Sequence, residues 1–253
     1  SSHFGRYDIA MASPLAVISH TDGVTKVEKN NTVKTTQVDP FDLIGVLLSE
    51  LLTDTSELVE AQGIPFTGGA AGLFGYDLGR SIESIPSTAS ADISMEHLCI
   101  GIYPWAIITD HELQKSYLVS QLDALSTQNL TENILQIKPF QGKEFSLKSD
   151  FVSIMTKKQY ADKFDRVIDY IHAGDCYQVC LAQRFEAPYN GNPWQAYKQL
   201  RMASPTPFSA YMETQEGALL SLSPERFLQV DQCKVETKPI KGTRPRGVTH
   251  EQD

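Results

Sequence analysis

Two residues near the carboxyl end of the sequence could together displace a hydroxyl group from a small molecule. Lys241 stands between Ile240 and Gly242, directly after a strand-like run. Apolar surroundings disfavour the ammonium form of a lysine and leave a free amine, which is a nucleophile. Glu225, which lies upstream, is a carboxylic acid that could protonate the leaving hydroxyl. From the residues alone, the alternative that Lys241 is a solvated turn lysine stays open.

The composition is that of a globular protein of one large domain or two small ones. Of the 253 residues, 41% are hydrophobic, and the net charge is -9 without any basic run, so we expect no nucleic-acid partner. No apolar stretch approaches the roughly 20 residues that cross a bilayer, so we expect no membrane partner. The cysteines form no CxxC pair, which favours free thiols in the cytoplasm over a zinc site. They are Cys99, Cys176, Cys180 and Cys233.

The first of two predicted regions spans residues 1–149. Asp39 is a typical helix N-cap residue, and Pro40 suits the first helical position. Apolar residues at helical spacing continue from there to Leu51. A polar helix and linker are predicted at residues 127–149. The predicted strands of this region are at residues 7–12, 15–18, 100–109 and 116–119.

A glycine-rich segment at residues 66–80 contains five glycines. Its glycines are not in the GxGxxG order of a dinucleotide-binding loop, and no alternation of strand and helix surrounds them. Glycines interleaved with large apolar residues instead indicate a strand that another backbone approaches closely.

The second predicted region spans residues 150–253. Thr156 and Gln159 form a capping box, and Gly174 is a typical helix stop. A short helix is predicted from Pro193. The predicted strands are at residues 177–182, 208–213, 218–222, 226–230 and 234–237. Together the two regions predict an α+β fold, with antiparallel β-sheets forming a two-region sandwich and helices packed outside.

Four segments of the second region resemble the chorismate-binding enzymes, and the glycine-rich segment resembles the N-terminal region of their synthase subunits. The four segments are residues 174–179, 181–185, 221–227 and 239–243. The resemblance implies that residues 1–149 form an N-terminal region of the anthranilate synthase component I type. It implies that residues 150–253 begin the chorismate-binding catalytic region, which would continue beyond this sequence.

Single residues distinguish the activities within this family. Anthranilate synthase subunits usually have alanine where Lys241 stands, and isochorismate synthases have a lysine base where Gln178 stands. The combination found here implies conversion of chorismate and ammonia to 4-amino-4-deoxychorismate, through a covalent bond to lysine, for p-aminobenzoate and folate synthesis. The implied catalytic residues are Lys241 and Glu225. The implied substrate-binding residues are Gln178, Gly242 and Thr243.

The resemblance also implies a cofactor and a partner. A magnesium ion would hold the chorismate carboxylate, with its ligands expected beyond Asp253 and none within this sequence. A glutaminase subunit would supply the ammonia. Because those ligands are expected elsewhere, residues 1–253 alone are expected to be inactive. Cys180 departs from the family pattern, since amidating members usually have asparagine there.

A tryptophan site is a further implication, because related subunits bind tryptophan between two sheets. An adjoining leucine-rich segment of the family would precede Ser1. The alternative for these positions is a sandwich core filled by side chains. The matching residues are Phe4, Gly5, Arg6, Tyr7, Pro207, Phe208 and Ser209.

Other functions stay open at this point. One is an anthranilate synthase-like chorismate enzyme. A second is a non-catalytic sandwich that keeps only the amino-acid site, although such a module has no need for both Lys241 and Glu225. A third is an obligate interaction subunit whose chemistry is lost by truncation.

Overall fold

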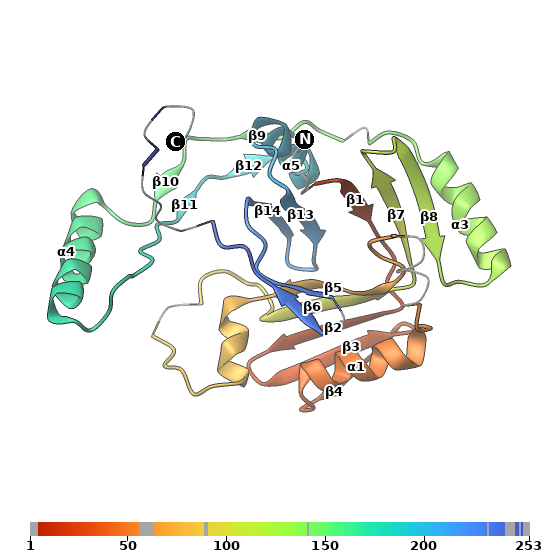
Figure 1. The fold of residues 1–253 in the computed structure, drawn as a ribbon, viewed down its shortest axis with the longest axis horizontal. Helices are drawn as coiled ribbons and strands as arrows, with labels where there is room; N and C mark the ends of the chain where they lie inside the picture. Colours follow the sequence, from red (N-terminus) through yellow and green to blue (C-terminus); the bar gives the residue numbers. More distant parts are fainter. Residues whose placement is uncertain are drawn as a thin grey trace. The chain divides into compact units, whose positions relative to one another are not determined.

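A computed structural model describes residues 5–55, 63–88, 91–140, 142–231, 233–240, 246, 247 and 249. The chain divides into two compact units (Figure 1). The first unit comprises Ser1–Lys138 and Ser204–Asp253, and the second comprises Pro139–Ala203. The predicted boundary at residue 149 separates two regions by family resemblance and not by compactness, and it stays a prediction.

The main sheet of the first unit has five antiparallel strands in the order β4-β3-β2-β6-β5. Helix α1 (Pro40–Leu51) lies along one face of this sheet, as Figure 1 shows. The side chain of Asp39 caps the helix by accepting a hydrogen bond from Phe41 N at 2.8 Å, which confirms the predicted start. The strands are β2 (Ala16–Thr21), β3 (Val24–Lys29), β4 (Thr32–Thr36), β5 (Gly69–Phe74) and β6 (Leu98–Tyr103).

The hydrophobic core lies between this sheet and α1. Ile18 of β2 and Ile100 and Ile102 of β6 are almost fully buried, and Leu47 of α1 packs against them. Side chains alternate between the two faces of a strand, so the neighbours of these isoleucines point away from the helix. The core therefore fixes which residues of β2 and β6 lie on the opposite face.

A second sheet of the first unit has the order β1-β7-β8. The strand predicted at residues 100–109 is wrong as a single element, because β6 ends at Tyr103 and β7 begins at Trp105. Pro104 between them has no N–H to donate to a ladder, and the chain changes sheets there. The strands are β1 (Tyr7–Ala10), β7 (Trp105–Asp110) and β8 (Lys115–Ser120), followed by helix α3 (Ala124–Gln136).

Two hairpins complete the first unit. β13 (Phe208–Glu213) pairs with β14 (Ala218–Ser223), and β15 (Gln229–Asp231) pairs with β16 (Lys234–Glu236). The bounds of β13 are as predicted, and β14 ends one residue later than predicted, at Ser223. The strand predicted at residues 226–230 begins only at Gln229, because side-chain contacts take the place of a backbone ladder before it.

The second unit is built from helix α4 (Lys157–Ala173), helix α5 (Pro193–Ala203) and two-residue ladders. The predicted capping box is confirmed: Thr156 Oγ1 accepts from Gln159 N at 3.2 Å, and Gln159 Oε1 accepts from Thr156 N at 2.8 Å. Gly174 ends α4 with φ of 82°, a left-handed conformation that favours glycine. The ladders are β10 (Val152–Ser153) with β11 (Phe185–Glu186) and β9 (Ser146–Leu147) with β12 (Tyr189–Asn190).

The strand predicted at residues 177–182 is wrong. These residues form no strand in the structure, and Tyr177 is 93% exposed. Alternation of apolar and polar residues gives a strand only where another strand supplies hydrogen-bond partners. Among the described strands, none pairs with this segment.

The α+β fold class is confirmed by these antiparallel sheets and their few helices. The glycine-rich segment is a strand as far as Phe74, and a 3₁₀ helix, η1 (Tyr76–Ser81), follows it. Within the described ranges, none of the helices combines the length and apolar character needed to cross a bilayer.

Substitution of Gly72 tests whether the backbone of β6 closely approaches that of β5. A Cβ at this position would lie 2.0 Å from the carbonyl oxygen of Cys99, a backbone atom that cannot move away alone. We therefore expect Gly72→Ala to lower the free energy of unfolding by about 1–3 kcal/mol in chemical denaturation. Gly45→Ala is the matched control, because a Cβ there meets nothing within 4 Å. It should raise the same free energy by about 0.5–1 kcal/mol, since alanine favours a helix. Equal effects of the two changes would contradict the steric account.

Candidate active site

The segment that contains Glu225 is a tight turn fixed by one hydroxyl group. Ser223 Oγ donates to Glu225 O at 2.7 Å and accepts from Glu225 N at 3.2 Å. Pro224 between them fixes its own φ. Because Ser223 is the last residue of β14, the turn starts from a paired strand. The backbone of Glu225 is therefore held by the end of the β13–β14 hairpin.

The carboxylate of Glu225 is bound to the chain directly before Lys241. Glu225 Oε1 accepts a hydrogen bond from Ile240 N at 3.1 Å, and the Glu225 side chain is half-buried. Ile240 is joined to Lys241 by a peptide bond. Lys241, Gly242 and Thr243 lie outside the described residues. The predicted acid thus binds the residue that precedes the predicted nucleophile in the sequence.

Two further contacts join the same segments. Thr237 Oγ1 donates to Phe227 O at 3.0 Å. The guanidinium of Arg226 forms an ion pair with Glu236. Three consecutive residues from Glu225 onward are therefore all bound to the chain that runs from β16 towards Lys241.

Gln178 belongs to the second unit, where it is exposed in the segment after α4 that forms no strand. Cys180, two residues on, is also exposed. The structure assigns neither residue a partner that would define its role. Substrate binding by Gln178 stays a prediction.

Two segments predicted for the tryptophan site meet in the first unit. A Cβ on Gly5 would lie 3.8 Å from Pro207 Cα, so the start of the chain and the approach to β13 are in van der Waals range. Tyr7 begins β1, and its hydroxyl donates to Gly63 O at 3.3 Å. Phe4 lies outside the described residues. The meeting of the two segments is what an amino-acid site between them requires, while ligand binding itself stays a prediction.

The hydroxyl of Ser209 has already used its single proton. It donates to Thr206 O at 2.9 Å, so the 2.7 Å contact with Thr206 Oγ1 must be donated by the threonine. Ser209 Oγ therefore keeps acceptor capacity only. With these two hydrogen bonds in place, a ligand would meet Ser209 Oγ through an N–H group, such as an ammonium.

Arg6 is bound to two carboxylates of the protein. Its Nε and Nη2 donate to both oxygens of Asp110, the shortest contact being 2.6 Å, and its Nη1 lies 3.1 Å from Glu112. The side chain of Asp110 is 3% exposed and also accepts from the backbone N–H groups of Glu112 and Leu113. The Arg6 hydrogen bond is the main cause that lowers the pKa of Asp110 from 3.8 to about 2. This geometry favours a structural role for Arg6.

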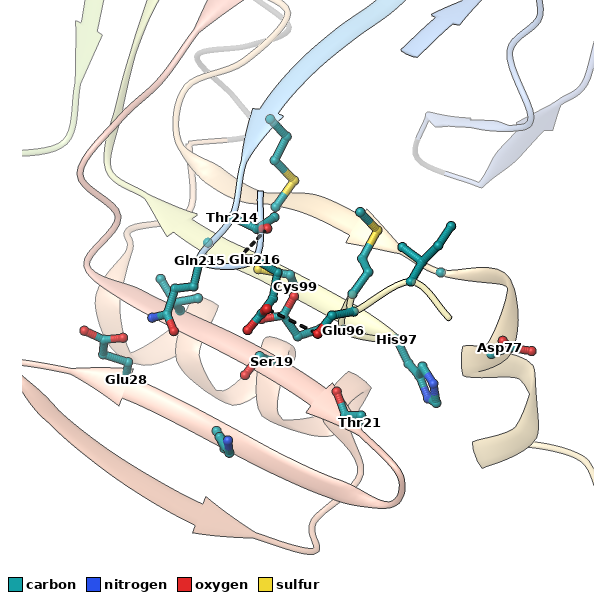
Figure 2. A pocket seen from close by; sticks show the side chains of 18 of the residues that line it. Ser19, Thr21, Glu28, Asp77, Glu96, His97, Cys99, Thr214, Gln215 and Glu216 are labelled. Atoms are coloured by element: carbon teal, nitrogen blue, oxygen red, sulfur yellow. Dashed lines mark hydrogen bonds between the residues drawn. The ribbon is translucent and has the colours of Figure 1, made fainter. Parts of the chain in front are cut away.

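A broad cavity of about 1540 Å³ lies on the face of the main sheet opposite α1. Figure 2 shows Ser19, Thr21 and Cys99 on the sheet, with the turn of the β13–β14 hairpin beside them. Burial, together with nearby Glu96, raises the pKa of the Cys99 thiol, which disfavours the nucleophilic thiolate. None of the described residues predicted for the two sites lines this cavity.

The described residues do not fit a magnesium site. Among them, no group of three or more His, Cys, Asp or Glu side chains could hold a metal ion. The expectation of magnesium ligands beyond Asp253 stays a prediction.

Several residues that stabilise the two predicted sites are not among the residues predicted from the sequence. Asp110 ends a strand and begins a turn, a position where an Asp side chain often binds backbone N–H groups, so this signal was readable. Ser223 before Pro224 was a similar signal for a turn. The pairing of Arg226 with Glu236 had no sequence signal, because it depends on the register of the last hairpin.

Comparison with known proteins assigns the chain to a family of chorismate enzymes. Residues 5–253 match the chorismate binding enzyme family, and the chain belongs to this family. It is 43% identical over 246 residues to a protein from Escherichia coli K12 named aminodeoxychorismate synthase component 1, covering 96% of this chain and 52% of that protein. A protein of the same name from Klebsiella aerogenes is 42% identical, with 98% and 54% covered. The chain thus spans about half the length of these relatives.

Relatives with a different name also match. A protein from Lactococcus lactis named anthranilate synthase component 1 is 30% identical, with 98% of this chain and 55% of that protein covered. The crystal structure of anthranilate synthase component I from Streptococcus pneumoniae TIGR4 matches with a TM-score of 0.77 at 24% identity. That match covers 93% of this chain and 54% of the other, and it shows the same fold.

The ion pair between Arg6 and Asp110 makes stability depend on pH. A carboxyl group whose pKa is lowered on folding contributes stability that is present above pH 3.8 and lost as the pH falls towards 2. We expect Asp110→Asn to lower the melting temperature at pH 6, and the difference from wild type to narrow between about pH 4 and pH 2. Asp162→Asn, which removes an exposed pair with Lys158, should change little at any pH. A difference for Asp110→Asn that is constant across this window would contradict the assignment.

Proposed function

We propose that the natural polypeptide containing this sequence converts chorismate and ammonia to 4-amino-4-deoxychorismate, towards p-aminobenzoate and folate. The names of the relatives from Escherichia coli and Klebsiella aerogenes support this reaction. The structural observation that supports it most is the hydrogen bond between Ile240 N and the Glu225 carboxylate. It holds an acid beside the residue that precedes a lysine, as a two-part displacement device requires.

The proposed reaction has two displacements. The free amine of Lys241 forms a bond to the ring carbon beside the one that bears the carboxylate, the ring double bonds shift, and the C–O bond to the ring hydroxyl breaks. Glu225 gives its proton to the departing hydroxyl, which leaves as water. Ammonia then bonds to the former hydroxyl carbon, the double bonds shift back, and Lys241 is released as an amine. The proton that ammonia loses returns Glu225 to its acid form, so the sum is aminodeoxychorismate and water.

The identity of residue 241 favours this reaction over anthranilate synthesis. Subunits that make anthranilate usually have alanine there, while this chain has lysine. A lysine paired with an acid also argues against a binding module without chemistry, because ligand binding needs neither a nucleophile nor a proton donor.

We also propose a glutaminase subunit as the source of ammonia, which the name component 1 of the relatives supports. We propose a cytoplasmic location, supported by the four free cysteines. The contact between Gly5 and Pro207 supports a tryptophan site next to β13. There the acceptor at Ser209 Oγ suits the ammonium group of an amino acid.

Glu225→Gln tests the acid. The amide cannot donate a proton to the leaving hydroxyl, so we expect kcat with chorismate and ammonia to fall about a hundredfold to ten-thousandfold at unchanged melting temperature. The measurement is steady-state formation of aminodeoxychorismate by the natural polypeptide. Glu132→Gln, the same change in exposed helix α3, should keep kcat within about twofold. Wild-type turnover by Glu225→Gln would remove this residue from the mechanism, and anthranilate as the wild-type product would refute the proposed function.

Added tryptophan tests the amino-acid site. A ligand that binds only the folded state raises the melting temperature by mass action. We expect a rise of a few degrees for the natural polypeptide at millimolar tryptophan, and we expect Ser209→Leu to abolish it by filling the site. Ala210→Leu is the matched control, because the adjacent strand residue lies on the other face and is exposed. The site is ordinary core if wild type shows no shift and releases no tryptophan on denaturation.

A further inference from the structure

We propose that Arg226 is a positioning residue that holds the Glu225 carboxylate against the segment before Lys241. The inference rests on the proposed function, since it assigns Arg226 a role through Glu225. Arg226 is not among the site residues that the sequence predicts.

The guanidinium of Arg226 joins three strands. Its Nη1 is hydrogen-bonded to Gln229 of β15, and its Nη2 is paired with Glu236 of β16. Its Cζ lies 5.9 Å from the ring centroid of Phe208 in β13, within the range of a cation–π contact. The Arg226 side chain is 19% exposed, so these contacts are partly shielded from water. The planar guanidinium can make all of them at once, which a single ammonium group could not.

The position of Arg226 in the chain explains why these contacts bear on Glu225. The backbone ladder of the last hairpin ends at the pair Gln229 and Glu236. Before Gln229, side-chain contacts keep the two segments together: Arg226 with Glu236, Thr237 with Phe227 O, and Glu225 with Ile240 N. Because Arg226 and Glu225 are adjacent, loss of the ion pair would leave the two segments joined, among the described contacts, by two hydrogen bonds: Thr237 with Phe227 O, and Glu225 with exposed Ile240.

Electrostatics keeps the partner of Arg226 ionised. The hydrogen bond from Lys238 is the main cause that lowers the pKa of Glu236, and the charge of Arg226 lowers it further. Lys238 Nζ lies 3.0 Å from Glu236 Oε1. The carboxylate of Glu236 is therefore ionised at neutral pH, and its ion pair with Arg226 persists there.

The test combines Arg226→Gln with the acid variant. A displacement of a catalytic group by about 1 Å can cost about a hundredfold, so we expect Arg226→Gln to lower kcat by about tenfold to a hundredfold, with KM for chorismate within about twofold. If Arg226 acts through Glu225, adding Arg226→Gln to Glu225→Gln should lower kcat by less than about twofold more. Arg226→Lys keeps the positive charge but loses the planar set of N–H donors. Its kcat should lie between those of wild type and Arg226→Gln.

Control variants separate positioning from folding. Glu236→Gln removes the same ion pair from the other side and should also lower kcat without changing KM. It keeps the test decisive if Arg226→Gln does not fold. Arg166→Gln is the matched control, because Arg166 is exposed on α4 and contacts Tyr170 of the same helix. Its kcat should equal that of wild type.

Four other results would contradict the positioning role or the proposed function, and they can be told apart. Wild-type kcat in both Arg226→Gln and Glu236→Gln overturns the positioning role, as does a full additional loss in the Glu225→Gln background. A lower melting temperature that accounts for all lost activity assigns Arg226 to folding instead. Wild-type kcat in Glu225→Gln overturns the proposed function of the acid itself, independently of Arg226.

Discussion

The pairing register of β13 and β14 is the constraint on which both predicted sites depend. It places Phe208 opposite Ser223 and Ser209 opposite Leu222. The start of β13 therefore belongs to the predicted amino-acid site, while the end of β14 leads into the turn that contains Glu225. A slip of one residue would turn every side chain of one strand to the other face and separate these functions.

From this hairpin, successive polar contacts extend towards Lys241. Ser223 fixes the backbone of Glu225, and Glu225 in turn binds the backbone of Ile240. Arg226 joins the same turn to Glu236 and rests over Phe208. Each contact is modest alone, because a hydrogen bond contributes about 0.5–1.5 kcal/mol net. Together they hold an acid in place beyond the ends of the described ladders, and they link that acid to a residue of the predicted amino-acid site.

Local signals in the sequence predicted the elements that local interactions form. The capping box at Thr156, the stop at Gly174 and the bounds of β13 needed only neighbouring residues. Prediction failed where a strand depends on a partner strand for its hydrogen bonds. Residues 177–182 alternate between apolar and polar side chains as a strand does, but they pair with no described strand. In the site, Glu225 could be chosen from its motif, whereas the pairing of Arg226 with Glu236 follows from a tertiary register that no spacing reveals.

The covalent intermediate on Lys241 is the central claim, and peptide-mapping mass spectrometry tests it most directly. The natural polypeptide would be incubated with chorismate without ammonia, so that the second displacement cannot occur, then quenched and digested. The account predicts that the peptide containing Lys241 gains the mass of chorismate less one water, and that added ammonia removes the adduct. An adduct on any other residue, or none while the enzyme still turns over chorismate when ammonia is supplied, would contradict it.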